Sequence, residues 1–262
     1  MRVSQIVGSR SIDLNVDIGE GFGHDEELLK FASSANVCCG VHAGSPELTL
    51  ETIDLCLRHR VRVGIHPGYP DRVSMGRNPM QPGQEPTYLK SLFEQTAWFV
   101  DVAKPSYMKP HGAFYSDTAV VLPHDWEKLK KRSPGVSDYE SGGVYLSQFP
   151  GVQSLLMLLR IHHMPLVGLE PTAHRVVASR AHQSFIREGF ADRRYRRDGT
   201  LVPRTEPGAV LTDPEEIREQ ALELATRVDS ICLHGDTPDC VVFAELVYKS
   251  LLDAGYGVGA RS

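Results

Sequence analysis

Polar and apolar residues alternate along SIDLNVDI, residues 11–18 of the chain. If this run is a β-strand, Asp13, Asn15 and Asp17 project from one face and the apolar residues between them from the other. Polar side chains on a buried face are stable only when they have partners. The spacing therefore predicts an inward-facing polar cluster. A strand with a solvated polar face is the alternative interpretation.

Further residues that could do chemistry stand at the ends of later strand-like runs: Asn36, His42, His66, Lys109, His111 and His234. A lone histidine beside glycine is usually structural, but histidines repeated at successive strand ends indicate a shared site. Neutral imidazole and carboxylate bind divalent metals, and imidazole also exchanges protons near neutral pH. Metal binding and acid–base catalysis both fit these residues.

Acidic and arginine side chains gather in a later stretch. Glu188, Asp192 and Arg193 lie in REGFADRRY, and Arg204 lies in TLVPRTEPGA. Arginine binds a carboxylate through two parallel hydrogen bonds, so this stretch favours a small anionic substrate. For the other arginines of the loop, a solvated network of ion pairs is an equal alternative.

Several common signatures are missing from the sequence. It contains no G-x-x-x-x-G-K-[ST] phosphate loop, no G-x-S-x-G nucleophile elbow and no H-E-x-x-H. Cys38 and Cys39 end a strand-like run, where cysteine is usually a packing residue. Because the phosphate loop is missing, the chain offers a nucleotide no ordinary phosphate cradle.

Seven strand-like runs alternate with amphipathic helical stretches, which is typical of a parallel sheet or barrel with helices outside. The runs span residues 11–18, 34–40, 61–67, 106–112, 164–170, 184–192 and 229–236. The helical stretches span residues 25–34, 45–60, 85–103, 151–163, 171–183, 214–228 and 238–255. Two segments interrupt the alternation, a polar insertion or lid at 116–150 and an arginine-rich loop at 193–214. In such folds the loops after the strands carry the site.

Length and composition predict one globular α/β domain over residues 1–262, because α/β barrels commonly run about 200–250 residues as one domain. The chain is 41% hydrophobic and has a net charge of -5, so it offers no general attraction to nucleic acid or anionic lipid. No signal peptide or membrane span is recognisable. Five cysteines without a C-x-x-C favour a reducing, cytoplasmic location.

Six longer motifs follow one another along the chain: DLNVDIGEGFG (13–23), SSANVCCGVHAG (33–44), VGIHPGYPD (63–71), MKPHGAFY (108–115), FADRRYRRDGTLVPRTEPGA (190–209) and ICLHGDTP (231–238). Together they resemble the family of 5-oxoprolinase A subunits, the LamB/YcsF family of lactam-utilisation proteins. The resemblance implies a single seven-stranded, TIM-barrel-like (β/α) barrel similar to polysaccharide deacetylases. It also implies a part in the ATP-dependent opening of 5-oxoproline to L-glutamate, together with the B and C subunits of such an enzyme.

The resemblance carries roles to particular positions. The catalytic candidates are Asp17, His42, His66, Lys109 and His111. By analogy with the deacetylases, Asp17, His42 and His111 would hold a divalent metal of unspecified identity. The expected substrate-binding residues are Glu20, Asp192, Arg193, His234 and Asp236 from the family's motifs, and Asp13, Asn15, Asn36, Glu188 and Arg204 from the strand-end and arginine patterns described above.

The leading hypothesis is ATP-linked hydrolysis of a small carboxylated lactam. An amide carbonyl must be activated before water attacks it, and without a phosphate loop the activation is expected from partner subunits. Asp17 or His111 would deprotonate the water, and His42 and His66 would position or polarise the reacting groups.

Lys109 would stabilise developing negative charge, and Arg193 or Arg204 would hold the substrate carboxylate.

The sequence leaves two alternative functions open: a metal-dependent amidase or deacetylase that acts alone, and a non-catalytic subunit that carries a substrate. Homo-oligomerisation is compatible with each of the three hypotheses.

Overall fold

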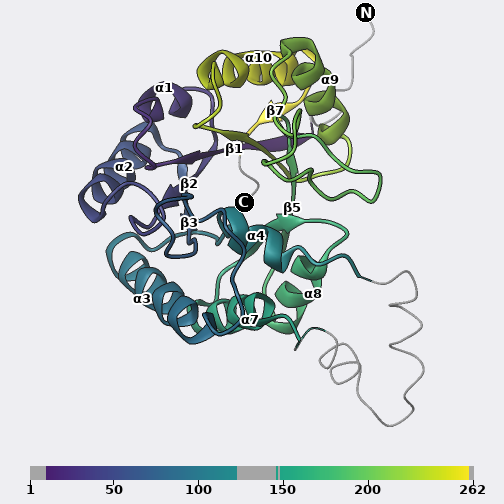
Figure 1. Cartoon of the computed structure of the whole chain (residues 1–262). Coiled ribbons are helices and arrows are strands. Elements are labelled where there is room, and N and C mark those ends of the chain that lie inside the picture. The colour runs from purple at the N-terminus through teal and green to yellow at the C-terminus, as the bar shows by residue number, and fades with distance from the viewer. Residues whose placement is uncertain (1–9, 123–145, 147, 260–262) are drawn as a thin grey trace, which may run out of the picture.

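Parallel β-strands form a ring, and α-helices surround it (Figure 1). The computed structural model describes residues 10–122, 146 and 148–259. The strands are β1 (Ser11–Ile18), β2 (Ser34–Cys38), β3 (Arg62–His66), β4 (Leu166–Leu169), β5 (Phe185–Phe190), β6 (Ser230–His234) and β7 (Gly257–Val258). The order β3-β2-β1-β6-β5-β4 places β1 at the centre of the sheet.

Met108 closes the ring between the two outer strands, β3 and β4, through parallel bridges to Ile65 and Leu166. Lys109 N donates to Ile65 O at 3.0 Å, and Met108 N donates to Pro165 O at 2.9 Å. The expected seven-stranded, TIM-barrel-like architecture is therefore confirmed. The expected strand at 106–112 is reduced to this single bridge residue, because the nearby Pro110 has no N–H to continue a ladder.

The seventh regular strand, β7, was not expected from the sequence. It pairs with the first two residues of β1, Ser11 with Gly257 and Ile12 with Val258. Two paired residues are too short a run to show a period of two, which explains the omission.

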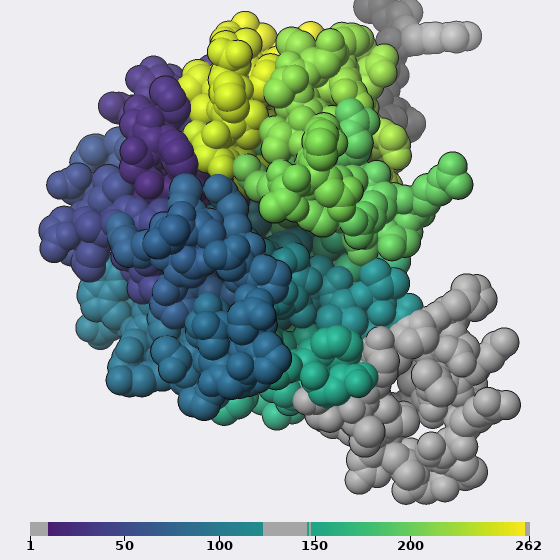
Figure 2. All heavy atoms as spheres, in the orientation of Figure 1, coloured from purple at the N-terminus to yellow at the C-terminus, as the bar shows by residue number. Residues whose placement is uncertain are grey.

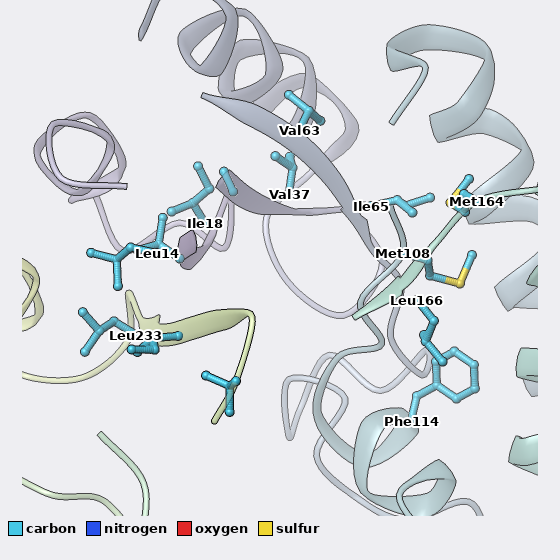
Figure 3. Close-up of a cluster of buried hydrophobic side chains, with 14 of the residues drawn as sticks. Leu14, Ile18, Val37, Val63, Ile65, Met108, Phe114, Met164, Leu166 and Leu233 are labelled. Atoms are coloured by element: carbon cyan, nitrogen blue, oxygen red, sulfur yellow. The ribbon is translucent and has the colours of Figure 1, made fainter. Parts of the chain in front are cut away.

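The alternation along β1 has the predicted effect. Asp13, Asn15 and Asp17 are buried and bond to side chains of neighbouring strands inside the ring. The apolar residues of β1 pack outward in the hydrophobic core shared with the helices. Figure 3 shows Leu14 and Ile65 from two of the strands in this core, with Leu166 and Phe114. The polar interior is thus separated from solvent by an apolar layer.

Helices fill the spaces between consecutive strands on the outside of the ring. They are α1 (Asp25–Leu29), α2 (Pro46–His59), α3 (Glu85–Ala103), α4 (Gly112–Thr118), α7 (Pro150–His162), α8 (Ala173–Arg180), α9 (Pro214–Ala225) and α10 (Cys240–Asp253). All seven expected helices are present, with ends shifted by a few residues. Ser45 caps α2 by accepting from Leu48 N at 3.2 Å, and Asp213 caps α9 by accepting from Glu216 N at 2.9 Å. The short helix α4 was not expected.

The predicted insertion or lid at 116–150 falls mostly on residues 123–145 and 147, which lie outside the described residues. Within the described residues, no helix is long and apolar enough to cross a membrane.

The loop 193–214 is held by antiparallel bridges from Arg193 to Val210 and from Tyr195 to Leu201. Its green atoms lie across the barrel end from the blue segment that follows β3 (Figure 2).

Candidate active site at the mouth of the barrel

The lower layer of the barrel interior consists of fully bonded polar groups. Asp13 accepts from Ser34 at 2.7 Å and from Ser230 at 2.5 Å. Asn15 donates to Ser230 at 2.7 Å and accepts from Asn36 at 2.6 Å. Asp13, Asn15 and Asn36 were expected to bind substrate. The structure places them below the mouth, where their bonds link β1, β2 and β6.

A buried ion cluster lies directly above this layer. Lys109 Nζ is 2.9 Å from Asp17 Oδ1 and 2.8 Å from Glu188 Oε1. It also lies 3.2 Å from Asn15 Oδ1 and 2.9 Å from the sulfur of Cys232. These four contacts saturate the ammonium group of Lys109, a residue that is about 1% exposed. Cys232 was not among the predicted site residues.

The charges of this cluster stabilise one another. Burial alone would raise the pKa of Asp17, but Lys109, His66 and His234 hold the pKa of Asp17 well below its ordinary value. Burial would lower the pKa of Lys109, but Asp17, Cys232 and Glu188 raise it well above its ordinary value. Asp17 is therefore an ionised carboxylate at neutral pH, and Lys109 is an ammonium ion.

Three histidines pack together beside Asp17. The rings of His42 and His111 stack with centroids 3.8 Å apart, and His66 meets His111 edge-on with centroids 4.8 Å apart. Glu20 Oε1 lies 3.5 Å from His42 Nε2 and 3.3 Å from His111 Nδ1. The structure thus joins residues from the loops and ends of β1, β2 and β3 and from the segment after Met108, as the strand-end pattern predicts.

His234 and Asp192 form a second acid–base pair across the mouth. His234 Nδ1 donates to Asp192 Oδ1 at 2.9 Å, and the backbone N–H of His234 donates to Asp192 Oδ2 at 3.0 Å. Burial would raise the pKa of Asp192, but His234 and Arg204 keep it below its ordinary value. The ring of His234 stacks on Phe190, and its Nε2 lies 3.7 Å from Asp17 Oδ2. The side chain of His234 is 11% exposed, more than those of the other site histidines.

Arginines gather at the rim of the mouth. Arg204 binds Asp236 through two nitrogens at 2.9 and 3.2 Å, and Arg77 pairs with the same carboxylate. Arg193 instead donates to two backbone carbonyls, Ala209 O at 3.2 Å and Val202 O at 2.7 Å. Burial and the neighbouring Arg204 lower the pKa of Arg193 to about 10.

Sequence reasoning missed Arg77 and Met75, which belong to the loop after β3. The loop folds back over the mouth, so that Met75 O lies 2.9 Å from His111 Nε2. Neither residue belongs to a motif with its own chemical signature. Their position one loop beyond a predicted strand is the one signal that could have included them.

A parallel barrel whose strand ends converge on carboxylates, histidines and arginines defines the class of (β/α)-barrel proteins with a polar site at the carboxyl ends of the strands. The LamB/YcsF family model matches residues 12–122 and 155–261, and the chain therefore belongs to the LamB/YcsF family.

Curated relatives agree with this assignment over nearly the whole chain. The A subunit of 5-oxoprolinase from Bacillus cereus (strain ATCC 14579) is 34% identical, covering 95% of this chain and 98% of that protein. The A subunit of 5-oxoprolinase from Thermus thermophilus is 34% identical, covering 95% and 99%. A solved structure, a lactam utilization protein from Thermus thermophilus, has 30% identity and a TM-score of 0.73 over 96% of this chain and 100% of that one.

Proposed function

We propose that this protein opens a small carboxylated lactam by hydrolysis, with 5-oxoproline as substrate and L-glutamate as product. One observation carries the proposal: the ionised Asp17 carboxylate lies between His66, 3.4 Å away, and His234, 3.7 Å away, at the mouth of the barrel. A carboxylate and imidazoles at one point provide the proton transfers that amide hydrolysis requires. The relatives, which are named as A subunits of 5-oxoprolinase, support the choice of lactam.

His234 is the group best placed to take a proton from water, and the ionised Asp17 beside it stabilises the imidazolium that forms. The Nδ1 proton of His234 is held by Asp192, which leaves Nε2 to accept a proton at the mouth. Both nitrogens of His111, by contrast, already face Met75 O and His66 Nε2. Water would attack the lactam carbonyl carbon, the C–N bond would break, and the nitrogen would leave with a proton as the amino group of the product.

Arg193 is the stronger candidate for the substrate carboxylate. Arg204 has its charge neutralised by Asp236 through two hydrogen bonds. Among the described residues, no carboxylate lies within ion-pair distance of Arg193, whose side chain is held by backbone carbonyls alone. A guanidinium that is buried without an anion is prepared to accept one.

Lys109 acts as a positioning residue in this scheme. Its ammonium group is occupied by four neighbours, so it fixes Asp17 in its charged form and does not reach the substrate. The negative charge that develops on the carbonyl oxygen is then stabilised by groups nearer the rim.

Activation by ATP and by partner subunits completes the proposal. The names of the relatives, which are A subunits, support an assembly with other chains. Because the sequence has no phosphate loop, those other chains would supply the activated carbonyl. The B and C subunits of a 5-oxoprolinase are the proposed partners.

Glutamate release from radiolabelled 5-oxoproline tests the proposal. The purified chain is assayed with and without ATP, alone and co-expressed with the B and C subunits. Glutamate formed when ATP and both partners are present supports the proposal. Equal turnover by the isolated chain without nucleotide supports an autonomous amidase instead. Tight binding with no turnover under any condition supports a substrate carrier, and either result overturns the scheme.

A further inference from the structure

Two histidine lone pairs face each other at the mouth of the barrel. His66 Nδ1 lies 2.8 Å from the carbonyl oxygen of Lys109, and because a carbonyl only accepts, the proton of His66 is on Nδ1. His111 Nε2 lies 2.9 Å from the carbonyl oxygen of Met75, which places the proton of His111 on Nε2. The remaining nitrogens, His66 Nε2 and His111 Nδ1, are 2.9 Å apart. Two unprotonated nitrogens at this distance repel each other unless a positive ion is bound there.

A buried carboxylate faces the same point without a hydrogen bond of its own. Glu20 Oε1 is buried and has no hydrogen-bond partner among the described residues. It lies 3.3 Å from His111 Nδ1 and 3.5 Å from His42 Nε2, and these three atoms all lie within 4.8 Å of one another. An unsatisfied buried carboxylate is expensive, and a bound cation is one way to satisfy it.

We propose that Glu20, His42, His66 and His111 bind one divalent transition-metal ion of the Zn²⁺ or Mn²⁺ class. Three imidazole nitrogens and one carboxylate oxygen are a donor set that such ions favour. Ligand atoms bonded to one tetrahedral Zn²⁺ at about 2.0–2.1 Å lie about 3.3 Å from one another. The three distances given above, from 2.9 to 3.5 Å, match that spacing. The rings of His42 and His111 stack with centroids 3.8 Å apart, so one of them must turn before both nitrogens bond to the same ion.

This ligand set differs from the expected one by including Glu20 and His66 and leaving out Asp17. Asp17 Oδ2 lies 3.4 Å from His66 Nε2, beside the set, while its Oδ1 is engaged by Lys109 and Asn36. The carbonyl oxygens of Lys109 and Met75 orient the rings of His66 and His111, as outer hydrogen-bond partners of metal-binding histidines do. The inference goes beyond the proposed function, because binding of the ion is a property of the free protein without lactam, ATP or partners.

Metal content of the full chain tests the inference directly. The protein is purified without an affinity tag, depleted with a chelator, repleted with Zn²⁺ or Mn²⁺ and analysed by elemental mass spectrometry. The parent should retain about one ion per chain, and Glu20→Gln and His111→Asn should retain about tenfold less. His234→Asn removes a nearby imidazole outside the set and is the matched control, which should retain the ion. Circular dichroism confirms that each variant is folded.

Binding of Co²⁺ to the depleted parent gives a second readout that needs no variant. A d–d absorption band typical of nitrogen and oxygen ligands supports the site, and Glu20→Gln should weaken it. A parent that retains no metal and gives no Co²⁺ band overturns the inference. In that case a single proton shared between His66 Nε2 and His111 Nδ1 holds the two rings together. Metal lost in His234→Asn but retained in Glu20→Gln also overturns it, and places the ion at Asp17, Cys232 and His234.

Discussion

Replacing Lys109 with methionine should destabilise the fold more than any surface charge change. The substitution keeps most of the side-chain volume but leaves Asp17 and Glu188, 2.9 and 2.8 Å from the lost ammonium, buried without their cation. Removing one partner of a buried ion pair typically costs about 3–5 kcal/mol, because a charge remains unpaired in a medium of low polarity. We therefore expect Lys109→Met to lower the free energy of unfolding by about that amount.

Urea denaturation followed by circular dichroism at pH 7 measures the effect, and a double-mutant cycle gives its origin. In Lys109→Met/Glu188→Gln one of the two unpaired carboxylates is removed. The double variant should therefore lose about 1–3 kcal/mol less unfolding free energy than the sum of the two single losses. Lys249→Met is the control, because Lys249 is exposed and, within the part of the chain that the structure describes, pairs only with Glu245 on the same helix. It should change stability by less than about 0.5 kcal/mol. A Lys109→Met variant within about 1 kcal/mol of the parent, or no coupling in the cycle, would refute the reasoning.

Three further changes test other parts of the structure. Burial lowers the pKa of His174 from 6.5 to about 3, so the folded state disfavours the charged form and stability is lost as pH falls below about 6.5. Between pH 7 and pH 5 this amounts to about 2 kcal/mol, and urea titrations of His174→Gln should show a pH dependence smaller by that amount. In Gly64→Ala the new Cβ would overlap the Tyr107 ring, so calorimetry should show a loss of unfolding free energy of about 1–3 kcal/mol, against almost none for Gly259→Ala. In glutamate-release assays, Arg193→Met should raise KM for 5-oxoproline at least about tenfold, and an unchanged KM would exclude Arg193 as the carboxylate anchor.

Periodicity was sufficient to predict most of the barrel. The alternation along residues 11–18 gave β1 its observed bounds, and every expected helix is present. The segment around Met108 was harder, because its bridges to Ile65 and Leu166 depend on partners distant in sequence. β7 was beyond reach for the same reason, since two residues acquire strand geometry only by pairing with β1.

The residues of the site were easier to predict than their contacts. The rule that strand ends converge correctly brought Asp17, His66, His111 and His234 together. It could not show that Lys109 is saturated by its neighbours, because that follows from side-chain directions inside the closed ring. Nor could it show the alignment of the His66 and His111 lone pairs, which depends on two backbone carbonyls.

Binding of 5-oxoproline to the isolated chain tests most directly whether the barrel mouth receives a carboxylated lactam. Isothermal titration calorimetry compares 5-oxoproline with 2-pyrrolidinone, the same ring without the carboxylate. We predict one 5-oxoproline per chain and affinity for 2-pyrrolidinone weaker by at least about tenfold, since a charge-assisted pair with arginine contributes about 1.5–3 kcal/mol. Equal affinity for the two rings, or no binding of 5-oxoproline, would contradict this account of the site.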